Sequence, residues 1–228
     1  MSHFNVAVFT HKPDDLTALL DPFSEDVDAD SPYAAFEEDE DGELNETLGK
    51  RGYWHNPNAK WDWWLLGGRW RGQLKLKEGC TGAYGEASWM NKDAPVDVTH
   101  CDMALVADCD FAVDAQAYEQ ALRAWEILVE GVPLRDGEKE TDFLRIYKPE
   151  YYIRQYGTKE NYARSLSRFH TFAFVTADGD WHEAGAMGWF GVDSSTVESR
   201  ETYQEQFAEY LKEAEKLGLY ISIVDMHI

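Results

Sequence analysis

The chain has 228 residues, of which 44% are hydrophobic and 14% aromatic, enough apolar material for a folded core and too much for disorder over most of its length. No apolar run is long enough for a membrane helix, and no basic-then-apolar leader opens the sequence, so we expect a cytoplasmic protein without a membrane partner. The formal net charge of −22 excludes direct non-specific binding to nucleic acid, because such a chain repels phosphates. Cys80, Cys101 and Cys109 contain no CxxC pair, which argues against a disulfide framework or a thiolate zinc site.

The N-terminal part begins with a strand and continues into a strongly acidic segment. Alternating apolar residues predict a strand from His3 to Thr10, and Pro13 starts a turn into a short helix at residues 16–20. From Pro13 to Gly49 there are 14 Asp or Glu residues and no Lys or Arg. Repulsion between like charges keeps such a segment extended or loosely looped. We interpret residues 21–49 as an acidic insertion, which is either a solvated loop or an arm for a basic partner.

The remaining elements follow from periodicity, caps and turn residues. The segment 78–95 is rich in glycine and predicts a loop, and Met103–Ala107 is a short apolar run. Asp114 is a good N-cap for a helix, Asp178-Gly179 is a two-residue hairpin turn, and Gly218 ends the last helix. The elements predicted are one or two strands at 60–77, helices at 115–129, 150–167 and 199–217, and strands at 170–176, 180–184 and 219–228.

This order of elements predicts an α+β fold. Short connections and an antiparallel hairpin favour a mostly antiparallel sheet with helices on one face, and the best match is a ferredoxin-like core with large insertions. We expect residues 1–228 to form one domain, with a possible subdomain at 50–110. In such a sheet the last strand pairs antiparallel with the first.

The most unusual segment runs from Trp54 to Trp70 and holds five tryptophans in 17 residues. In an extended strand, Trp61 and Trp63 would share one face while Asp62 lies on the other, and Gly67-Gly68 would allow a bulge or a close approach to a ligand. Arg69 and Arg71 would project together and could hold a phosphate or carboxylate. Aromatic rings beside arginines are typical of a nucleotide site, although the same residues could form a core in which Arg69 pairs with Asp62. No phosphate loop or dinucleotide fingerprint is present.

The C-terminal strand supplies a second candidate site. Asp225 and His227 are two residues apart and therefore share a face. If the last strand pairs with the first, His3 lies close to His227, and two imidazoles with a carboxylate could bind a divalent metal or act as an acid–base pair. The alternative is a histidine that is hydrogen-bonded to its neighbour at a strand end.

A third candidate is the glycine-rich block after the predicted hairpin turn. Trp181 and Glu183 would share a face with Phe172 and Phe174 of the partner strand, which would place Glu183 on an aromatic surface. The glycines that follow indicate either a loop that approaches a ligand or a tight loop that packs Trp189 and Phe190 on the sheet edge.

Four blocks at both ends and in the interior of the chain form a recognisable set: Met1-Ser2-His3-Phe4, Asn56 to Trp63 with Gly67-Gly68-Arg69-Trp70, Glu183 to Gly191, and Val224 to Ile228. Together these blocks resemble a family of uncharacterised proteins from tailed bacteriophages and prophages. The last block has Met226 where Cys is expected. The resemblance implies a phage accessory protein that acts in the bacterial cytoplasm, where such proteins often antagonise host defence or redirect host metabolism, and it carries no catalytic residues over.

Two hypotheses remain for function. The first is a binding or enzymatic pocket for a small anionic ligand such as a nucleotide, lined by Trp61, Asp62, Trp63, Arg69, Arg71 and Glu183. The second is an acidic interaction protein, or a nucleic-acid mimic, that blocks a basic host protein through the arm at 21–46. A metal at His3, Asp225 and His227 is compatible with the first hypothesis.

Overall fold

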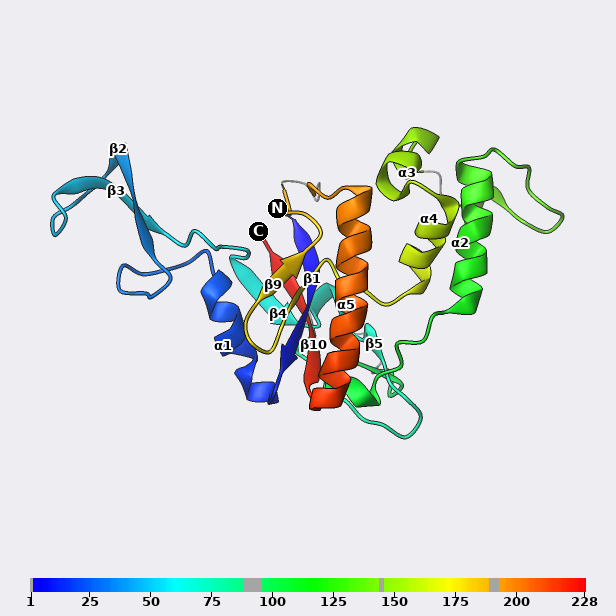
Figure 1. Ribbon diagram of the computed structural model, residues 1–228, viewed down its shortest axis with the longest axis horizontal. Helices are drawn as coiled ribbons and strands as arrows, with labels where there is room; N and C mark the ends of the chain where they lie inside the picture. Colours follow the sequence, from blue (N-terminus) through cyan, green and yellow to red (C-terminus); the bar gives the residue numbers. More distant parts are fainter. Residues whose placement is uncertain (1, 88–95, 144–145, 189–192) are drawn as a thin grey trace.

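The computed structural model of the protein describes residues 2–87, 96–143, 146–188 and 193–228. The strands are β1 His3–Thr10, β2 Ala35–Asn45, β3 Lys50–His55, β4 Trp63–Leu66, β5 Leu74–Lys75, β6 His100–Cys101, β7 Met103–Leu105, β8 Ala173–Val175, β9 Trp181–Glu183 and β10 Tyr220–His227. The helices are α1 Leu16–Leu20, α2 Ala115–Leu128, α3 Pro149–Tyr156, α4 Lys159–Ser167 and α5 Val197–Leu217, with short 3₁₀ turns between them. Figure 1 shows a central sheet with a long hairpin projecting from one side and a group of helices, labelled α2, α3 and α4, on the other.

The main sheet has the order β4-β10-β1-β8-β9, and β7 pairs with β10 beside β4. All its pairings are antiparallel except that of β1 with β8. The α+β class and the mostly antiparallel sheet are therefore confirmed, and so is the predicted pairing of the first strand with the last. Segment 50–110 contributes β4 and β7 to this sheet, both paired with β10.

The strand order departs from a ferredoxin-like core in one respect. A split β-α-β arrangement keeps a strand between two parallel strands, whereas β1 and β8 are direct parallel neighbours. The chain between them is not a single crossover helix: residues 11–172 carry the acidic hairpin, β4 to β7 and four helices, α1 to α4. Because this connection is long, β8 can pair directly with β1, and β9 then forms the edge of the sheet beside β8.

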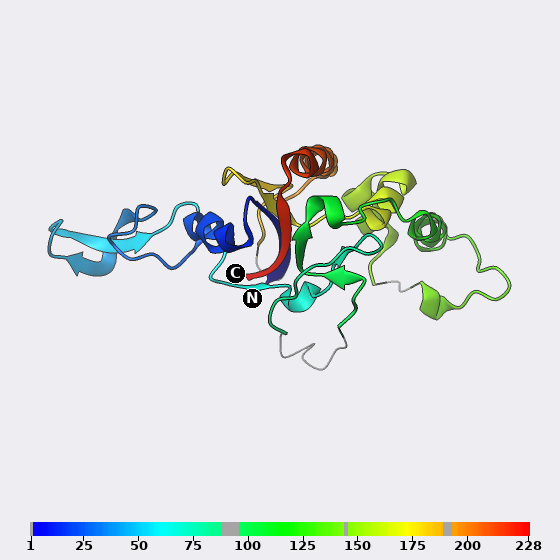
Figure 2. The ribbon, with the colours of Figure 1, turned by 90° about the horizontal axis from the view of Figure 1, so that it is seen from below.

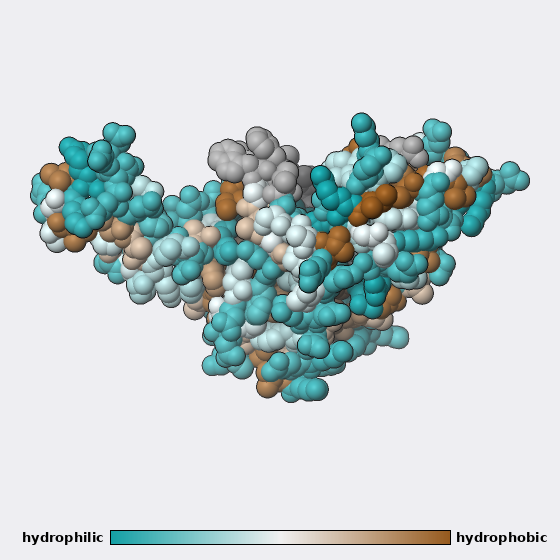
Figure 3. All heavy atoms as spheres, turned by 45° about the horizontal axis from the view of Figure 1, so that its top comes forward, coloured by the Kyte–Doolittle hydropathy of each residue, from teal (hydrophilic) through white to brown (hydrophobic). Residues whose placement is uncertain are grey.

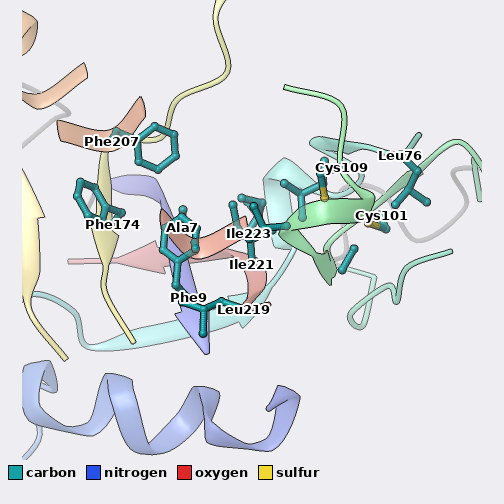
Figure 4. Close-up of a cluster of buried hydrophobic side chains, with 14 of the residues drawn as sticks. Ala7, Phe9, Leu76, Cys101, Cys109, Phe174, Phe207, Leu219, Ile221 and Ile223 are labelled. Atoms are coloured by element: carbon teal, nitrogen blue, oxygen red, sulfur yellow. The ribbon is translucent and has the colours of Figure 1, made fainter. Parts of the chain in front are cut away.

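Helices cover both faces of the sheet, which corrects the prediction of helices on one face. Side chains alternate along β1, so Ala7 and Phe9 belong to one apolar cluster and Val6 and Val8 to another. The first cluster packs against Phe207 and its neighbours on α5, as Figure 4 shows for Phe207 and Phe174. The second packs against α1, which lies across the sheet from α5 in Figure 2.

Local signals placed the helices well. The side chain of Asp114 accepts hydrogen bonds from the backbone N–H groups of Gln116 and Ala117, which caps α2 as predicted. The predicted helical region at 150–167 is two helices, because Gly157 ends α3 and the Thr158 side chain caps α4. Helices α2, α3 and α4 share their own apolar cluster around Trp125. No helix in the described part of the chain is long and apolar enough to cross a membrane.

The second half of the acidic segment is extended, one of the two predicted alternatives, and forms a hairpin: β2 Ala35–Asn45 and β3 Lys50–His55. β2 and β3 pair antiparallel, with an irregularity between Glu38 and Glu43. Glu37 to Asp41 are exposed along β2, and the surface of the hairpin is mainly hydrophilic in Figure 3, where it lies at the left. Cross-strand contacts offset part of the repulsion, since Lys50 pairs with Glu38 and the rings of Phe36 and Trp54 are 5.3 Å apart.

Candidate functional site

Polar side chains occupy one end of the sheet face that α5 covers elsewhere. Ile223 on β10 faces the α5 cluster, and because side chains repeat every two residues, Asp225 and His227 extend the same face toward the end of the strand. The pairing register aligns His3 of β1, His227 of β10 and Trp63 of β4 in one row across three strands. The apolar face therefore ends in a row of two imidazoles and an indole.

His3 is held by a buried carboxylate. Its Nδ1 atom lies 2.8 Å from Oδ1 of Asp225, whose side chain is only 1% exposed. The other carboxylate oxygen of Asp225 accepts the backbone N–H of Arg69 at 2.9 Å. Both oxygens are thus engaged, which is what a carboxylate buried at this depth requires.

His227 is held by a second carboxylate at the surface. Its Nδ1 atom lies 2.7 Å from Oδ1 of Asp62, whose side chain is 38% exposed. The rings of His3 and His227 meet edge to face with centroids 4.8 Å apart, and the Trp63 ring lies 5.8 Å from that of His3. Two carboxylate–imidazole pairs consequently lie side by side beneath a half-exposed tryptophan.

This arrangement suits acid–base chemistry. A carboxylate at Nδ1 fixes the orientation and tautomer of an imidazole and directs its reactivity to Nε2. Neither Nε2 atom of the pair has a hydrogen-bond partner among the described residues. Two such nitrogens close together could accept a proton from one group of a bound molecule and donate a proton to another.

The structure does not support a metal site formed by His3, Asp225 and His227. The three residues are neighbours, as predicted, but Asp225 is bound to His3 and to the backbone of Arg69, so it supports an imidazole instead of facing a shared centre. Within the described ranges, no group of three or more His, Cys, Asp or Glu side chains is arranged to hold a metal ion. The residues pair off because strand pairing places the Asp225 carboxylate beside the ring of His3.

The two adjacent glycines of the tryptophan-rich segment seat two buried aspartates. Both have positive φ, and a Cβ at Gly67 would lie 2.2 Å from Oδ2 of Asp102, while one at Gly68 would lie 2.4 Å from Oδ2 of Asp225. Asp102 accepts the backbone N–H groups of Gly72 and Gly85. Burial raises the pKa of the Asp102 carboxyl, against the lowering effect of these hydrogen bonds. The close approach predicted for Gly67-Gly68 is made by the protein's own carboxylates.

A cleft of about 580 Å³ opens beside the second pair, between the base of the hairpin and the end of the sheet. Trp61 is only 8% exposed at its floor. Asn56 secures the hairpin base, because its amide donates to the backbone oxygens of Pro22 and Ser24. The cleft is lined by Glu25, Tyr53, His55, Asn56, Ala59, Trp61, Asp62, Met187, Gly188, His227 and Ile228.

Of the predicted ligand-binding residues, only Trp61 and Asp62 line this cleft. Trp61 and Trp63 do not share an environment: Trp61 packs in the α1-side cluster and Trp63 is 45% exposed. The prediction was wrong because β4 begins at Trp63, so strand alternation does not extend back to Trp61.

Arg69 and Arg71 do not project together. Arg69 has an exposed side chain at the 3₁₀ turn Gly68–Trp70, whereas Arg71 donates to the backbone oxygen of Gly85 at 2.7 Å and lies over the Tyr84 ring. The tight turn at positive φ separates their directions. Arg71 therefore stabilises the loop that contains Tyr84 and Gly85.

Glu183 lies apart from the cleft in an ion pair. It accepts from Lys60 Nζ at 2.8 Å and from the indole N–H of Trp181 at 2.9 Å. The β8–β9 register places His182, not Glu183, opposite Phe174, which corrects the predicted face. Residues Trp189, Phe190 and Gly191 of this block lie outside the described residues.

Sequence reasoning missed the residues that the hairpin brings to the cleft, chiefly Tyr53 and His55. Their partners across the cleft are distant in sequence, at Glu25 and Met187. The sequence signal that was present is Asn56-Pro57-Asn58, a turn sequence that ends β3.

Comparisons with protein-family models, with curated proteins and with solved structures found no match to this chain.

Proposed function

We propose that this protein binds a small ring-bearing molecule in the cleft of about 580 Å³, with the imidazole of His227 as a polar partner. The observation that carries the proposal is the coincidence of this cleft with a carboxylate–imidazole pair at its wall. A cavity lined by aromatic and apolar groups with a few converging polar groups is typical of a small-molecule site. A flat ring would lie against Tyr53 and Met187.

The acidic residues that line the cleft indicate which kind of ligand it can bind. Glu25 and Asp62 contribute two carboxylates, and no Lys or Arg of the described residues lines the cleft. An uncharged or cationic ring therefore fits better than the anionic ligand expected when arginines were placed here. A nucleobase in a nucleoside has the required flat shape. The resemblance to phage proteins would place this binding inside an infected bacterium.

Calorimetric titration with nucleosides and the matching nucleoside monophosphates tests this proposal. We expect the nucleoside to bind more tightly than its phosphate ester, because the phosphate meets the two rim carboxylates. Tyr53→Ala should weaken binding about tenfold, through loss of a stacking contact. The matched control is Tyr33→Ala, which removes a comparably exposed tyrosine that does not line the cleft. Absence of saturable binding for every compound would contradict the proposal.

A second candidate function rests on the projecting hairpin. Glu37 to Asp41 form an exposed acidic ridge on β2 that extends away from the body (Figure 1). Such a ridge is complementary to a basic protein surface. In this second candidate function, the acidic ridge binds a basic host protein and blocks it.

Fluorescence anisotropy with a labelled lysine-rich peptide distinguishes this candidate from general charge attraction. Converting Glu37 to Asp41 to amides should abolish most of the binding at low salt. The control converts five carboxylates of α5, Glu198, Glu205, Glu209, Glu213 and Glu215, which makes the same change in net charge. Equal losses in both variants would show that only net charge matters.

A further inference from the structure

The stretch from Lys148 to Arg168 is locally basic in this acidic chain. It holds five Lys or Arg residues and two Glu, while the whole chain has 21 basic against 43 acidic residues. The stretch forms α3 and α4, which lie beside α5 in Figures 1 and 2. The excess of acidic over basic residues in the whole chain is therefore reversed within this stretch, which favours an anionic ligand near it.

Three arginines, two from this stretch and one from α5, line one groove. Arg164 and Arg168 at the end of α4 and Arg200 in the first turn of α5 surround a cavity of about 270 Å³. Polar side chains that can donate hydrogen bonds complete the lining, namely Gln155, Asn161, Ser165 and Gln204. The planar guanidinium fork matches the geometry of a phosphate or carboxylate.

Arg200 is held in place and keeps donors to spare. Its Nε donates to Ser195 Oγ at 2.6 Å, one Nη to the backbone oxygen of Gln155 at 3.0 Å, and the other Nη to Asp193 at 3.3 Å. These contacts use three of the five N–H groups of a guanidinium. A fixed guanidinium loses less entropy when it binds a ligand than a mobile one does.

Among the three arginines of the groove, the side chain of Arg168 has the fewest polar contacts with other protein groups. Its side chain is exposed and has no hydrogen-bond or ion-pair partner among the described residues. Glu201 and Glu205 also line the groove, but Glu201 accepts a hydrogen bond from Asn161 and Glu205 is exposed to solvent. Exposed charges of this kind are screened by salt and weaken the site without closing it.

A second cavity of about 250 Å³ adjoins the groove and shares Gln155, Tyr156, Ser165, Arg200 and Gln204 with it. Its additional lining includes the aromatic rings of Tyr151, Phe172 and Tyr203, together with the carboxylate of Asp193, which Arg200 already binds. An anionic group at the arginines would therefore leave the rest of a molecule beside aromatic rings.

From this geometry we infer that the α4–α5 groove is a second binding site, which takes the phosphate group of a small phosphorylated molecule at Arg164, Arg168 and Arg200. The organic part of that molecule lies in the adjoining aromatic cavity. None of the residues that line these two cavities lines the cleft beside His227. The inference is independent of the proposed function, and it places anion binding away from Arg69 and Arg71.

Calorimetry at an ionic strength of about 0.15 M, where exposed carboxylates are screened, with inorganic phosphate and with adenosine 5′-monophosphate tests the inference. Arg168→Gln should weaken the binding of both compounds about tenfold, and Arg164→Gln should do so comparably, because each loses a charged hydrogen bond. Arg69→Gln is the matched control, with the same change in charge at another exposed arginine, and should bind as the unmodified protein does.

The outcomes separate cleanly. Tighter binding of the monophosphate than of inorganic phosphate supports the aromatic cavity as the place of the organic part, and equal affinities would overturn that part of the inference. Equal weakening by Arg69→Gln would show that net charge, not the groove, controls binding. No saturable binding of either compound to the unmodified protein would overturn the site itself.

Discussion

His3 and His227 are directly paired on neighbouring antiparallel strands, with their ring centroids 4.8 Å apart and each Nδ1 atom held by a different aspartate. One aspartate, Asp225, precedes His227 by two residues on the same strand, yet it binds the histidine of the other strand. The second, Asp62, comes from the segment just before β4. Three distant parts of the chain thus build one paired unit at the end of the sheet.

Removing the charge of Asp225 should destabilise the fold. Asp225→Asn keeps one oxygen for the backbone N–H of Arg69 but turns an NH₂ group toward His3, so the ring must switch tautomer to accept at Nδ1, and a carboxylate acceptor is replaced by a neutral amide. Hydrogen bonds to charged groups contribute about 1.5–3 kcal/mol, more than neutral ones. We expect urea denaturation to show a loss of this size in the free energy of unfolding.

The control for this substitution is Asp62→Asn, at the more exposed carboxylate of the other pair. Exposed ion pairs contribute about 0–1 kcal/mol, so the change in the free energy of unfolding should be small. Equal destabilisation by the two variants would show that burial of Asp225 does not determine its contribution.

The glycine that seats Asp225 should be intolerant of any side chain. Gly68→Ala places a Cβ 2.4 Å from the Asp225 carboxylate at a φ of +52°, so both overlap and backbone strain oppose it. We expect a loss of roughly 2–5 kcal/mol in the free energy of unfolding. Gly49→Ala isolates the backbone effect, because φ there is +65° and nothing lies within 4 Å of the added Cβ. That control should lose about 1–2 kcal/mol. Similar losses in thermal denaturation of both variants would contradict the seating role of Gly68.

The sequence predicted those features that depend on neighbouring residues. The first strand has the predicted bounds, His3–Thr10, because its alternation is uninterrupted. Asp114 and Gly218 mark helix ends through local hydrogen bonds and a left-handed backbone, and both act as predicted. The closeness of His3 and His227 was also predictable, since it needs only the pairing of two strands and their directions.

Features that depend on where a strand begins, or on contacts between distant segments, could not be predicted. Trp61 was assigned to the face of Trp63 because alternation was extended two residues beyond the strand. Gly67-Gly68 was correctly expected to allow a close approach, but the approaching groups come from Asp102 and Asp225, which are far away in sequence. The cleft needs the hairpin, and charge density alone predicted that segment to be extended or loosely looped, without the pairing of β2 with β3.

The clamp between α2 and its following loop should loosen in acid. Arg123 donates to both oxygens of Glu138, at 2.9 and 2.7 Å, and these bonds lower the pKa of the Glu138 carboxyl from 4.5 to about 2. A carboxyl with a lowered folded-state pKa stabilises the fold above its ordinary pKa, and this stabilisation is lost as the pH falls toward about 2.

Glu138→Gln should therefore reduce stability at pH 6 and have progressively less effect between pH 4.5 and about 2, as measured by urea denaturation across that range. Glu140→Gln, at an exposed glutamate of the same loop, serves as the control and should not change the pH dependence. A Glu138→Gln effect that is constant with pH would contradict the role of its ionised form.

The three cysteines should differ in reactivity by position. Burial raises the pKa of the Cys101 thiol to about 11 and that of Cys109 to about 12, so neither forms much thiolate at pH 8. Cys80 is only partly buried, although burial and the hydrogen bond to Asp108 also raise its pKa. With a thiol-specific chromogenic disulfide at pH 8 we expect one thiol to react in the folded protein and the other two only after unfolding in urea. Cys80→Ser should remove the folded-state reaction and leave the other two unchanged. Reaction of all three thiols at one rate would show that Cys101 and Cys109 are accessible in the native state.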